Sequence, residues 1–416
     1  MPAFEFHNLD RFAGSSASIK RPREFAYFSF DEEHRLHPLS DRSLSYYYPP
    51  FFSDPGTQNA RPDLSAGFDT FRQRDDTLDE HLDALLDTLQ AHEERVLSQI
   101  ENGESQGKIE DVATQADIIT WRGMMTKILT APFDGFSDFE MNATCYQVRK
   151  LRLLYCELLV NWRLTCGSFI EENHQYKVDL DRKVTAQPSR QHEASQAMMQ
   201  YWGYKFETLS VIPKPWAECS REEIEARDAQ VVNNHVQYCS IVRTGIGTSS
   251  LVIAGEVDAV LGGKPDNPDD PIPWVELKTT AEPPNAQPFE ILKFERKLLR
   301  FWAQSFLLGV PMIAIGYRTH DGRLVRIQEL QTQRIPSLVK QGMCAWNGNV
   351  CINFTAGLLD MVKATVGGRE GVWRLQKRRN EKQIRIFQIQ ETGTGEILKN
   401  SFKAHREKLR KMQAPS

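Results

Sequence analysis

The sequence predicts a mixed α/β fold with a central sheet. Helical periodicity marks the early part of the chain, short β-branched or alternating segments dominate residues 236–330, and one long helical segment interrupts those strands. Elements in this order are typical of a domain whose helices cover a sheet. We therefore expect residues 1–416 to form a single domain, with an irregular segment at about 1–75 and a basic segment at about 371–416.

Residues 1–75 are expected to lie as extended chain on a larger body. Tyr46-Tyr47-Tyr48-Pro49-Pro50-Phe51-Phe52 is aromatic and interrupted by proline, and Asp54-Pro55-Gly56 follows it. Proline and glycine at this density interrupt both helices and strands. This part of the chain is therefore not expected to fold independently.

Three helices are expected in the next part of the chain. The first covers about 78–100 and ends at Asn102-Gly103, a pair that favours the position after a helix. The second covers about 116–129, and its apolar positions again recur at helical spacing. The third, at about 146–169, is apolar on most sides, so it is expected to be buried.

The rest of the chain is expected to be rich in strands. Residues 170–193 are polar without a clear period, which predicts a loop or an insertion. A helix is expected at about 289–308. Short apolar or alternating segments predict strands at about 236–243, 250–260, 273–279, 312–318, 324–330 and 384–389.

Composition excludes several classes of protein. Forty per cent hydrophobic and 25% charged residues are typical of a globular chain and exclude a mainly disordered one. No apolar run approaches the ~18 residues of a membrane span, so no membrane partner is expected. The sequence contains no Cys-x-x-Cys pair, no His-Glu-x-x-His, no Walker A motif and no Gly-x-Ser-x-Gly elbow.

The charge balance hides an asymmetry. The formal net charge is −4, which at first argues against a nucleic-acid partner. Residues 371–416, however, carry 12 Lys and Arg against four Asp and Glu, so the preceding 370 residues hold a net −12. The near-neutral total therefore argues against a large non-specific nucleic-acid groove, but it is compatible with a pocket that captures one nucleic-acid end.

Two short strings carry the strongest signal of chemistry. They are Gly255-Glu256-Val257-Asp258-Ala259 and Trp274-Val275-Glu276-Leu277-Lys278-Thr279. Side chains alternate along a strand, so Glu256 and Asp258 are expected on one face of a strand, and Glu276 and Lys278 on one face of the next. If the two strands are neighbours, three carboxylates and one lysine converge.

Clustered carboxylates predict a divalent cation. Such groups repel each other and raise each other's pKa values, and a hard cation with oxygen ligands removes that cost. Mg²⁺ or Mn²⁺ suits this donor set, holds phosphate oxygens and lowers the pKa of an attacking water. Lys278 would then orient that water or stabilise charge on the phosphate. A solvated strand face with surface ion pairs explains the same two strings about equally well, because Glu295-Arg296-Lys297 repeats the Glu-x-Lys pattern on an expected helix.

Five strings, taken in order, resemble the motifs of a known family. They are Thr120-Trp121-Arg122-Gly123 with Leu129-Thr130-Ala131-Pro132, then Gly203-Tyr204-Lys205-Phe206-Glu207, Gly255-Glu256-Val257-Asp258, Val275-Glu276-Leu277-Lys278-Thr279 and Phe301-Trp302-Ala303-Gln304-Ser305-Phe306-Leu307. They resemble the motifs of the DXO/Rai family of RNA 5′-end processing enzymes over about residues 20–360. The acidic first helix, the length and the Arg-rich C-terminal stretch look like the fungal nuclear Rai branch.

The resemblance implies a fold and a set of site residues. It implies two twisted mixed sheets flanked by helices, related to the PD-(D/E)XK nucleases, with a pocket between the sheets for an RNA 5′ end. By motif, the metal-site residues would be Glu207, Glu256, Asp258 and Glu276, with the Leu277 carbonyl as a further ligand. Lys278 would activate or position the water, and Arg122 and Gln304 would contact the RNA. Two metal ions are expected in the active complex.

The residues by themselves leave alternatives open for three of these positions. The Arg122 guanidinium is a planar fork suited to a phosphate, but a surface ion pair is equally compatible with the sequence. Gln304 lies on an aromatic helix and would otherwise be a hydrogen-bonded core residue. The aromatic strip Tyr201–Tyr204 before Glu207 is interpreted as core in preference to a base-stacking surface.

The resemblance implies a function and a partner. The expected activities are release of pyrophosphate from 5′-triphosphate RNA, removal of unmethylated or incomplete caps, and removal of NAD caps, possibly with 5′-to-3′ exoribonuclease activity. The Rai branch also binds and stabilises a nuclear 5′-to-3′ exoribonuclease, which implies a nuclear location. The alternatives are a mainly non-catalytic partner of that exoribonuclease and a DNA nuclease of the PD-(D/E)XK type. Lys20-Arg21-Pro22-Arg23 and Lys377-Arg378-Arg379 are candidate import signals or phosphate contacts, although solvated surface is the preferred interpretation of either cluster alone.

Overall fold

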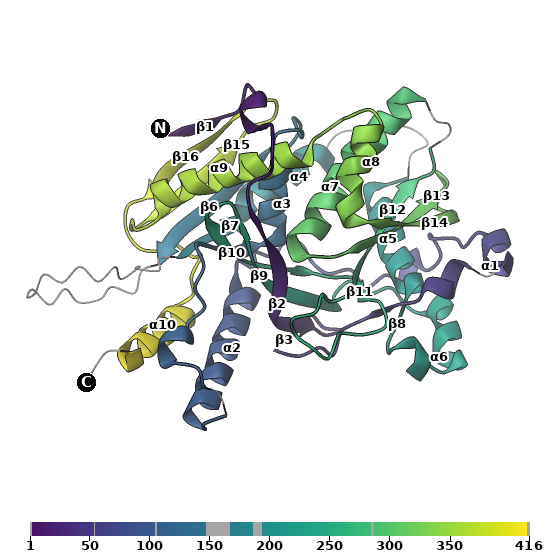
Figure 1. The fold of residues 1–416 in the computed structure, drawn as a ribbon. Helices are drawn as coiled ribbons and strands as arrows, with labels where there is room; N and C mark the ends of the chain where they lie inside the picture. The colour runs from purple at the N-terminus through teal and green to yellow at the C-terminus, as the bar shows by residue number, and fades with distance from the viewer. Residues whose placement is uncertain are drawn as a thin grey trace, which may run out of the picture.

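The computed structural model describes residues 2–53, 55–104, 106–146, 167–185, 194–283 and 287–413. Within these ranges the chain forms two mixed sheets flanked by helices (Figure 1). The expected mixed α/β fold with two sheets is therefore confirmed.

The larger sheet contains ten strands among the described residues, and its two central interfaces, β7–β5 and β5–β10, are parallel. The other neighbours in this sheet are antiparallel. In spatial order its strands are β1 (Ala3–Glu5), β16 (Gln383–Gln390), β15 (Val372–Lys377), β6 (Phe139–Tyr146), β7 (Gly167–Glu172), β5 (Ile118–Trp121), β10 (Ser249–Glu256), β9 (Gln237–Ile246), β2 (Ile19–Phe30) and β3 (Leu36–Pro38).

The smaller sheet contains six strands among the described residues. Its β13–β12 and β11–β4 pairs are parallel and the others are antiparallel. In spatial order its strands are β14 (Leu324–Gln331), β13 (Met312–Arg318), β12 (Trp274–Ala281), β11 (Ala259–Val260), β4 (Tyr46–Tyr47) and β8 (Val211–Ile212).

Helices cover both sheets (Figure 1). α3, α7 and α9 share a core with the larger sheet and with one face of β13. α2 and α10 pack on the opposite face of the larger sheet, and α5 packs on the smaller sheet. The α-helices are α1 (Pro55–Ala60), α2 (Asp83–Glu101), α3 (Arg122–Thr130), α4 (His174–Thr185), α5 (Gln196–Ser210), α6 (Arg221–Glu225), α7 (Pro288–Leu308), α8 (Ile335–Gln341), α9 (Gly348–Val366) and α10 (Asn400–Gln413).

The strands expected after residue 236 are confirmed, with one difference. The expected strand at 250–260 is two strands, because β10 ends at Glu256 and β11 begins at Ala259 in the other sheet. The chain therefore crosses between the two sheets at Val257 and Asp258. The helix expected at 289–308 is α7, and Gly309 at φ 74° ends it.

The early part of the chain differs more from expectation. The helix expected at 116–129 begins only at Arg122, because residues 118–121 are strand β5. Ile118, Ile119 and Thr120 are all buried, so this short strand lacks the alternation that distinguishes strand from helix. The segment at 1–75 supplies four strands, of which β2 is 12 residues long.

Strands β6 and β7 occupy parts of the two segments for which a buried helix and a loop were expected, 146–169 and 170–193. The buried helix expected at 146–169 falls mostly on residues 147–166, outside the described ranges, while Tyr146 ends β6 and residues 167–169 belong to β7. The loop expected at 170–193 is wrong for residues 170–185, which complete β7 and form α4. Alternating charged and apolar residues along α4 hid its helical period.

Candidate active site

The predicted site residues come from both sheets and three helices. Glu256 is the last residue of β10, and Asp258 lies in the crossing to β11. Glu276, Leu277 and Lys278 lie on β12. Arg122, Glu207 and Gln304 lie on α3, α5 and α7 respectively.

The carboxylates and Lys278 come together as expected, but the strand arrangement expected to bring them together is wrong. Glu256 and Asp258 do not share one face of a single strand, because the strand ends between them. Nor is β10 a neighbour of β12, since β12 pairs with β11 and β13. The crossing of the chain from one sheet to the other brings Asp258 to β12. There its Oδ2 accepts a hydrogen bond of 2.6 Å from the Leu277 backbone N–H.

Glu276 is the centre of an ion-pair cluster. Its side chain is 0% exposed, and it pairs with Lys278 Nζ at 2.7 Å and with Arg122 Nη1 at 3.1 Å. Lys278 Nζ also lies 3.7 Å from Asp258 Oδ2. Arg122, whose side chain is 13% exposed, thus pairs with a fully buried carboxylate, and the alternative of a surface ion pair is wrong.

The carboxylates outnumber the positive charges around them. Burial and the nearby Asp258 raise the pKa of Glu256 to about 7, and burial with Glu276 nearby raises the pKa of Asp258 to about 6 against the effect of Lys278. Burial, followed by Asp258, raises the pKa of Glu207 well above its usual value. Glu276 is the exception, because Arg122 and Lys278 outweigh burial and lower its pKa. The four carboxylates therefore share two cationic side chains, both of which lie closest to Glu276.

This donor set fits a divalent cation. Within the described ranges, no group of three or more His, Cys, Asp or Glu side chains is already arranged to hold a metal ion, and Glu276 is turned toward Arg122 and Lys278. The oxygens of Glu207, Glu256 and Asp258 are nevertheless close enough to raise each other's pKa values. A hard cation with oxygen ligands relieves this repulsion.

Two glycines allow the helices to bring their polar residues to this site. A Cβ on Gly255 would lie 2.8 Å from Cβ of Arg122, so glycine there lets the start of α3 approach β10 beside Glu256. A Cβ on Gly316 of β13 would lie 2.7 Å from the Phe206 ring, so glycine there lets α5 approach the smaller sheet with Glu207. Close approach of backbones is a common reason for glycine in a strand.

Gln304 lies on the face of α7 that packs beside Arg122. Leu308, one turn further along α7, would lie 3.0 Å from a Cβ on Gly255, and residues four apart share a helix face. Gln304 is partly exposed, and among the described residues its side chain makes no hydrogen bond. The alternative of a hydrogen-bonded core residue is therefore wrong, whereas the aromatic strip before Glu207 is core, as expected, at Tyr201 and Trp202.

Further polar residues near the site carried no motif. Gln237 of β9 donates a hydrogen bond of 3.4 Å to Glu256 Oε2. The charges of Glu207 and Glu256 contribute to the raised pKa of Tyr204, whose largest cause is burial. Cys239 of β9 pairs with Glu256 of β10, and Gln237 lies two residues before Cys239. The pairing of these two strands therefore gives a partial signal for Gln237.

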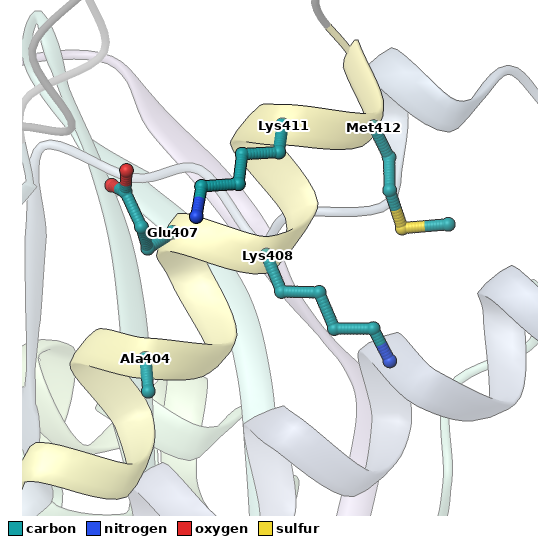
Figure 2. Close-up of a pocket in the computed structure, with 5 residues that line it drawn as sticks. All are labelled: Ala404, Glu407, Lys408, Lys411 and Met412. Atoms are coloured by element: carbon teal, nitrogen blue, oxygen red, sulfur yellow. The ribbon is translucent and has the colours of Figure 1, made fainter.

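Two hollows lie outside the carboxylate cluster. One, of about 270 Å³, is lined in part by Trp121 and Gly123 on either side of Arg122. The other, of about 480 Å³, follows α10 and is lined by Ala404, Glu407, Lys408, Lys411 and Met412, with none of the site carboxylates (Figure 2). In the described part of the chain, no helix has the length and apolar character needed to cross a membrane.

Known proteins resemble the chain over nearly its whole length. The decapping nuclease RAI1 of Aspergillus fumigatus is 48% identical over 400 residues, which cover 96% of this chain and 97% of that protein. A crystal structure of Candida albicans Rai1 in complex with pU5 and Mn²⁺ matches with a TM-score of 0.79 and 26% identity, covering 98% of this chain and 100% of that one. Scheffersomyces stipitis Rai1 in complex with (3′-NADP)⁺ and calcium matches with a TM-score of 0.79 and 25% identity, again covering 98% and 100%.

A family model confirms the resemblance inferred from the five motifs. The model, described as RAI1-like PD-(D/E)XK nuclease, matches residues 20–151 and 159–403. These ranges include every predicted site residue. The chain therefore belongs to the family of RAI1-like PD-(D/E)XK nucleases.

Proposed function

We propose that this protein is a divalent-metal-dependent hydrolase of RNA 5′ ends. Its substrates are 5′-triphosphate RNA, from which it releases pyrophosphate, and RNA with unmethylated or incomplete caps or NAD caps. The observation that carries the proposal is the group of three half-buried carboxylates, Glu207, Glu256 and Asp258, and the fully buried Glu276 around Lys278 and Arg122. The complexes of two relatives with pU5 and with (3′-NADP)⁺ support these substrate classes.

The metal site of this proposal comprises the four carboxylates and the Leu277 carbonyl. Mg²⁺ or Mn²⁺ fits it, and the Mn²⁺ in the Candida relative supports a divalent ion. We propose two ions in the active complex. Bound metal supplies an attacking water of lowered pKa and charge for the phosphate oxygens.

The side chains of Lys278, Arg122 and Gln304 position the water and the RNA end. Lys278 Nζ, held 2.7 Å from Glu276, donates a hydrogen bond that positions the attacking water. Burial lowers the Lys278 pKa, but Glu276 and Asp258 outweigh it, so the net shift is upward and the amine stays protonated. Lys278 therefore acts as a donor and does not remove a proton. The Arg122 guanidinium turns from Glu276 to the phosphate, and the free Gln304 amide contacts the same end of the RNA.

The double variant Glu256→Ala/Asp258→Ala tests this assignment. RNAs of one sequence carrying a 5′-triphosphate, an unmethylated cap or an NAD cap are incubated with Mg²⁺ or Mn²⁺, and pyrophosphate, capped dinucleotide or mononucleotides are identified. The variant should lose activity on all three ends. The control is Asp266→Ala/Glu391→Ala, at two exposed carboxylates. Full activity of the site variant would overturn the proposal, and mononucleotides from the wild type would indicate exoribonuclease activity.

The partner role and the nuclear location remain proposals beside the catalytic one. We propose that the protein also binds a nuclear 5′-to-3′ exoribonuclease through a surface separate from the site. A pull-down with the double variant should then retain the partner. The cluster at 377–379 is engaged in the fold, since Lys377 is buried and donates to the Ser137 carbonyl at 2.7 Å and Arg378 pairs with Glu140 at 2.7 Å. It is thus a poor candidate for an import signal.

The two alternatives are testable in the same experiment. The clustered carboxylates repel each other, and this repulsion destabilises the fold. Such a cluster has no use in a purely non-catalytic partner, so the chemistry of the site favours an enzyme. A DNA nuclease would cleave duplex DNA in preference to 5′-triphosphate RNA, and a duplex DNA sample in the assay distinguishes it.

A further inference from the structure

The segment between β11 and β12 carries a lysine that is enclosed by aromatic rings from both sheets. The Nζ atom of Lys264 lies 4.2, 4.9 and 5.5 Å from the ring centres of Tyr27, Tyr238 and Trp274 respectively. Tyr27 and Tyr238 belong to β2 and β9 of the larger sheet, whereas Trp274 begins β12 of the smaller sheet. An ammonium within ~6 Å of a ring is attracted to it. One cation therefore attracts rings from both sheets at once.

An ion pair and two hydrogen bonds fix this lysine in place. Lys264 Nζ donates to Glu24 Oε1 at 2.6 Å and to the Tyr238 hydroxyl at 2.5 Å. The same hydroxyl donates to Glu24 Oε2 at 3.1 Å, and burial, followed by Glu24, raises the pKa of Tyr238, so the hydroxyl keeps its proton. The side chains of Glu24 and Lys264 are only 8% and 24% exposed. Solvent ions screen a pair at this depth less than an exposed one.

Two of the enclosing residues also hold the crossing of the chain between the sheets. The Tyr238 carbonyl accepts a hydrogen bond of 3.1 Å from the Val257 backbone N–H, at the start of the crossing. Trp274 pairs with Val260, just after the crossing. Asp258 lies between these two attachment points, and the Tyr238 and Trp274 rings are 5.6 Å apart. The packing of these two rings therefore decides where Asp258 lies relative to the larger sheet.

A second ion pair ties the same segment to β2 at the surface. Arg23 Nη1 pairs with Asp269 Oδ1 at 2.6 Å, and the two side chains are 59% and 72% exposed. Pairs exposed to this extent contribute little to stability. This pair provides a matched comparison for the enclosed lysine, because it joins the same segment to the same strand in solvent.

We propose that Lys264 is a positioning residue for the metal site. By drawing Tyr238 of β9 and Trp274 of β12 together, it sets the distance between Glu256 at the end of β10 and Asp258 in the crossing. The inference rests on the proposed function, because it concerns the divalent ion that these carboxylates would hold. Lys264 acts through the two rings and does not contact the RNA. Residues behind metal ligands affect affinity in this way, since they fix the positions of the ligand oxygens.

The test is Lys264→Met, which keeps the length of the side chain but removes the cation. Mn²⁺ is titrated into the protein without RNA, and the free ion is followed by electron paramagnetic resonance. The Kd for Mn²⁺ should rise about tenfold, the cost of losing a residue that supports metal ligands, while kcat at saturating Mn²⁺ stays within about twofold of wild type. Lys264→Arg should restore binding, because arginine keeps the charge and stacks on aromatic rings. The control Arg23→Gln should bind Mn²⁺ as the wild type does.

A second variant separates positioning from stability. Lys264→Met leaves Glu24 buried without its partner, which by itself destabilises the fold. The double variant Lys264→Met/Glu24→Gln removes both charges, so its thermal unfolding should return toward that of wild type while Mn²⁺ binding stays weak. Binding that recovers together with stability would show that the lysine only stabilises the fold and would overturn the inference. An unchanged Kd in Lys264→Met would overturn it as well.

Hydrogen exchange keeps the inference distinct from the proposed function. If the wild type neither binds Mn²⁺ nor acts on any RNA end, the proposed function has failed, and amide exchange in metal-free protein decides the positioning role separately. Exchange in a peptide covering residues 255–260 should be faster in Lys264→Met than in wild type, because the Val257 N–H is less firmly bonded to the Tyr238 carbonyl. Exchange in α9 should not change. Equal exchange of residues 255–260 in the two proteins would contradict the positioning role.

Discussion

Arg122 Nη1 lies 3.1 Å from Glu276 Oε2, so the first residue of α3 is paired with the middle of β12. α3 packs on the larger sheet and β12 belongs to the smaller one, so this ion pair links the two layers at the place where the carboxylates gather. Glu276 accepts from Lys278 at the same time. A phosphate that enters the site competes with Glu276 for both cations.

Arg122→Lys should lower kcat/KM on all RNA 5′ ends by about tenfold or more. Lysine keeps the charge but loses the planar fork that binds two phosphate oxygens together. Initial rates on 5′-triphosphate RNA measure the effect, and Arg296→Lys, at an exposed position on α7, is the control. An Arg122→Lys enzyme as active as wild type would show that the fork does not contact the substrate.

Gly255→Ala should reduce both stability and activity. The added Cβ would lie 2.8 Å from Cβ of Arg122 and 3.0 Å from Leu308, so α3 and α7 must move away from β10. Overpacking of this kind costs about 1–3 kcal/mol. Thermal unfolding and kcat/KM measure the two effects. Gly263→Ala is the matched control, because a Cβ there meets nothing within 4 Å, and its stability should stay within about 0.5 kcal/mol.

Most strands after residue 236 could be predicted because local sequence determines them, although β15 (Val372–Lys377) was not expected. Alternation and bounding Gly or Pro residues mark β9 to β14, and β13 has the expected bounds of 312–318. β6 was missed because six of its eight residues are buried in the interior of the larger sheet, which removes the alternation. β2 was missed because it begins with charged residues and pairs irregularly, with register shifts near Arg23.

The convergence of the motif residues could be predicted from the sequence, but its geometry could not. The strings around Glu256 and Glu276 supplied side chains that the fold does bring together. The assumption of neighbouring strands failed, because the crossing between sheets at Asp258 depends on long-range pairing of β11 with β12. Glu207 reaches the site only through the packing of α5 on the smaller sheet, which no local pattern contains.

Gln304→Leu should lower activity while leaving stability unchanged. Because the Gln304 amide makes no hydrogen bond within the described residues, its loss breaks no contact of the fold. A role in binding the RNA end predicts a rise in KM or a fall in kcat of about tenfold, the value of one good hydrogen bond to a charged group. Thermal unfolding and steady-state kinetics separate the two effects. Marked destabilisation of the variant without a kinetic defect would mean that Gln304 is a structural residue of the core and does not bind the RNA end.

His92 should make the fold sensitive to mild acid. Burial, together with Arg95 and Arg243, lowers the pKa of His92 from 6.5 to about 4, and the ring packs edge-on against Phe25 at 5.2 Å. Because its folded pKa lies below the unfolded value, the unfolded chain takes up the proton first as the pH falls. The free energy of unfolding should therefore decrease from about pH 6.5 down to about pH 4, where the contribution of this residue levels off.

The variant His92→Gln isolates this contribution from the other groups that titrate in the same range. Urea unfolding at pH 7 and pH 5 gives the loss of stability for each protein, and the variant should lose less than wild type because it has no imidazole to protonate. His7→Gln, at an exposed histidine near the N-terminus, should lose as much as wild type. Equal losses in wild type and His92→Gln would mean that the pKa of His92 is the same in the folded and the unfolded protein, despite the two arginines beside it.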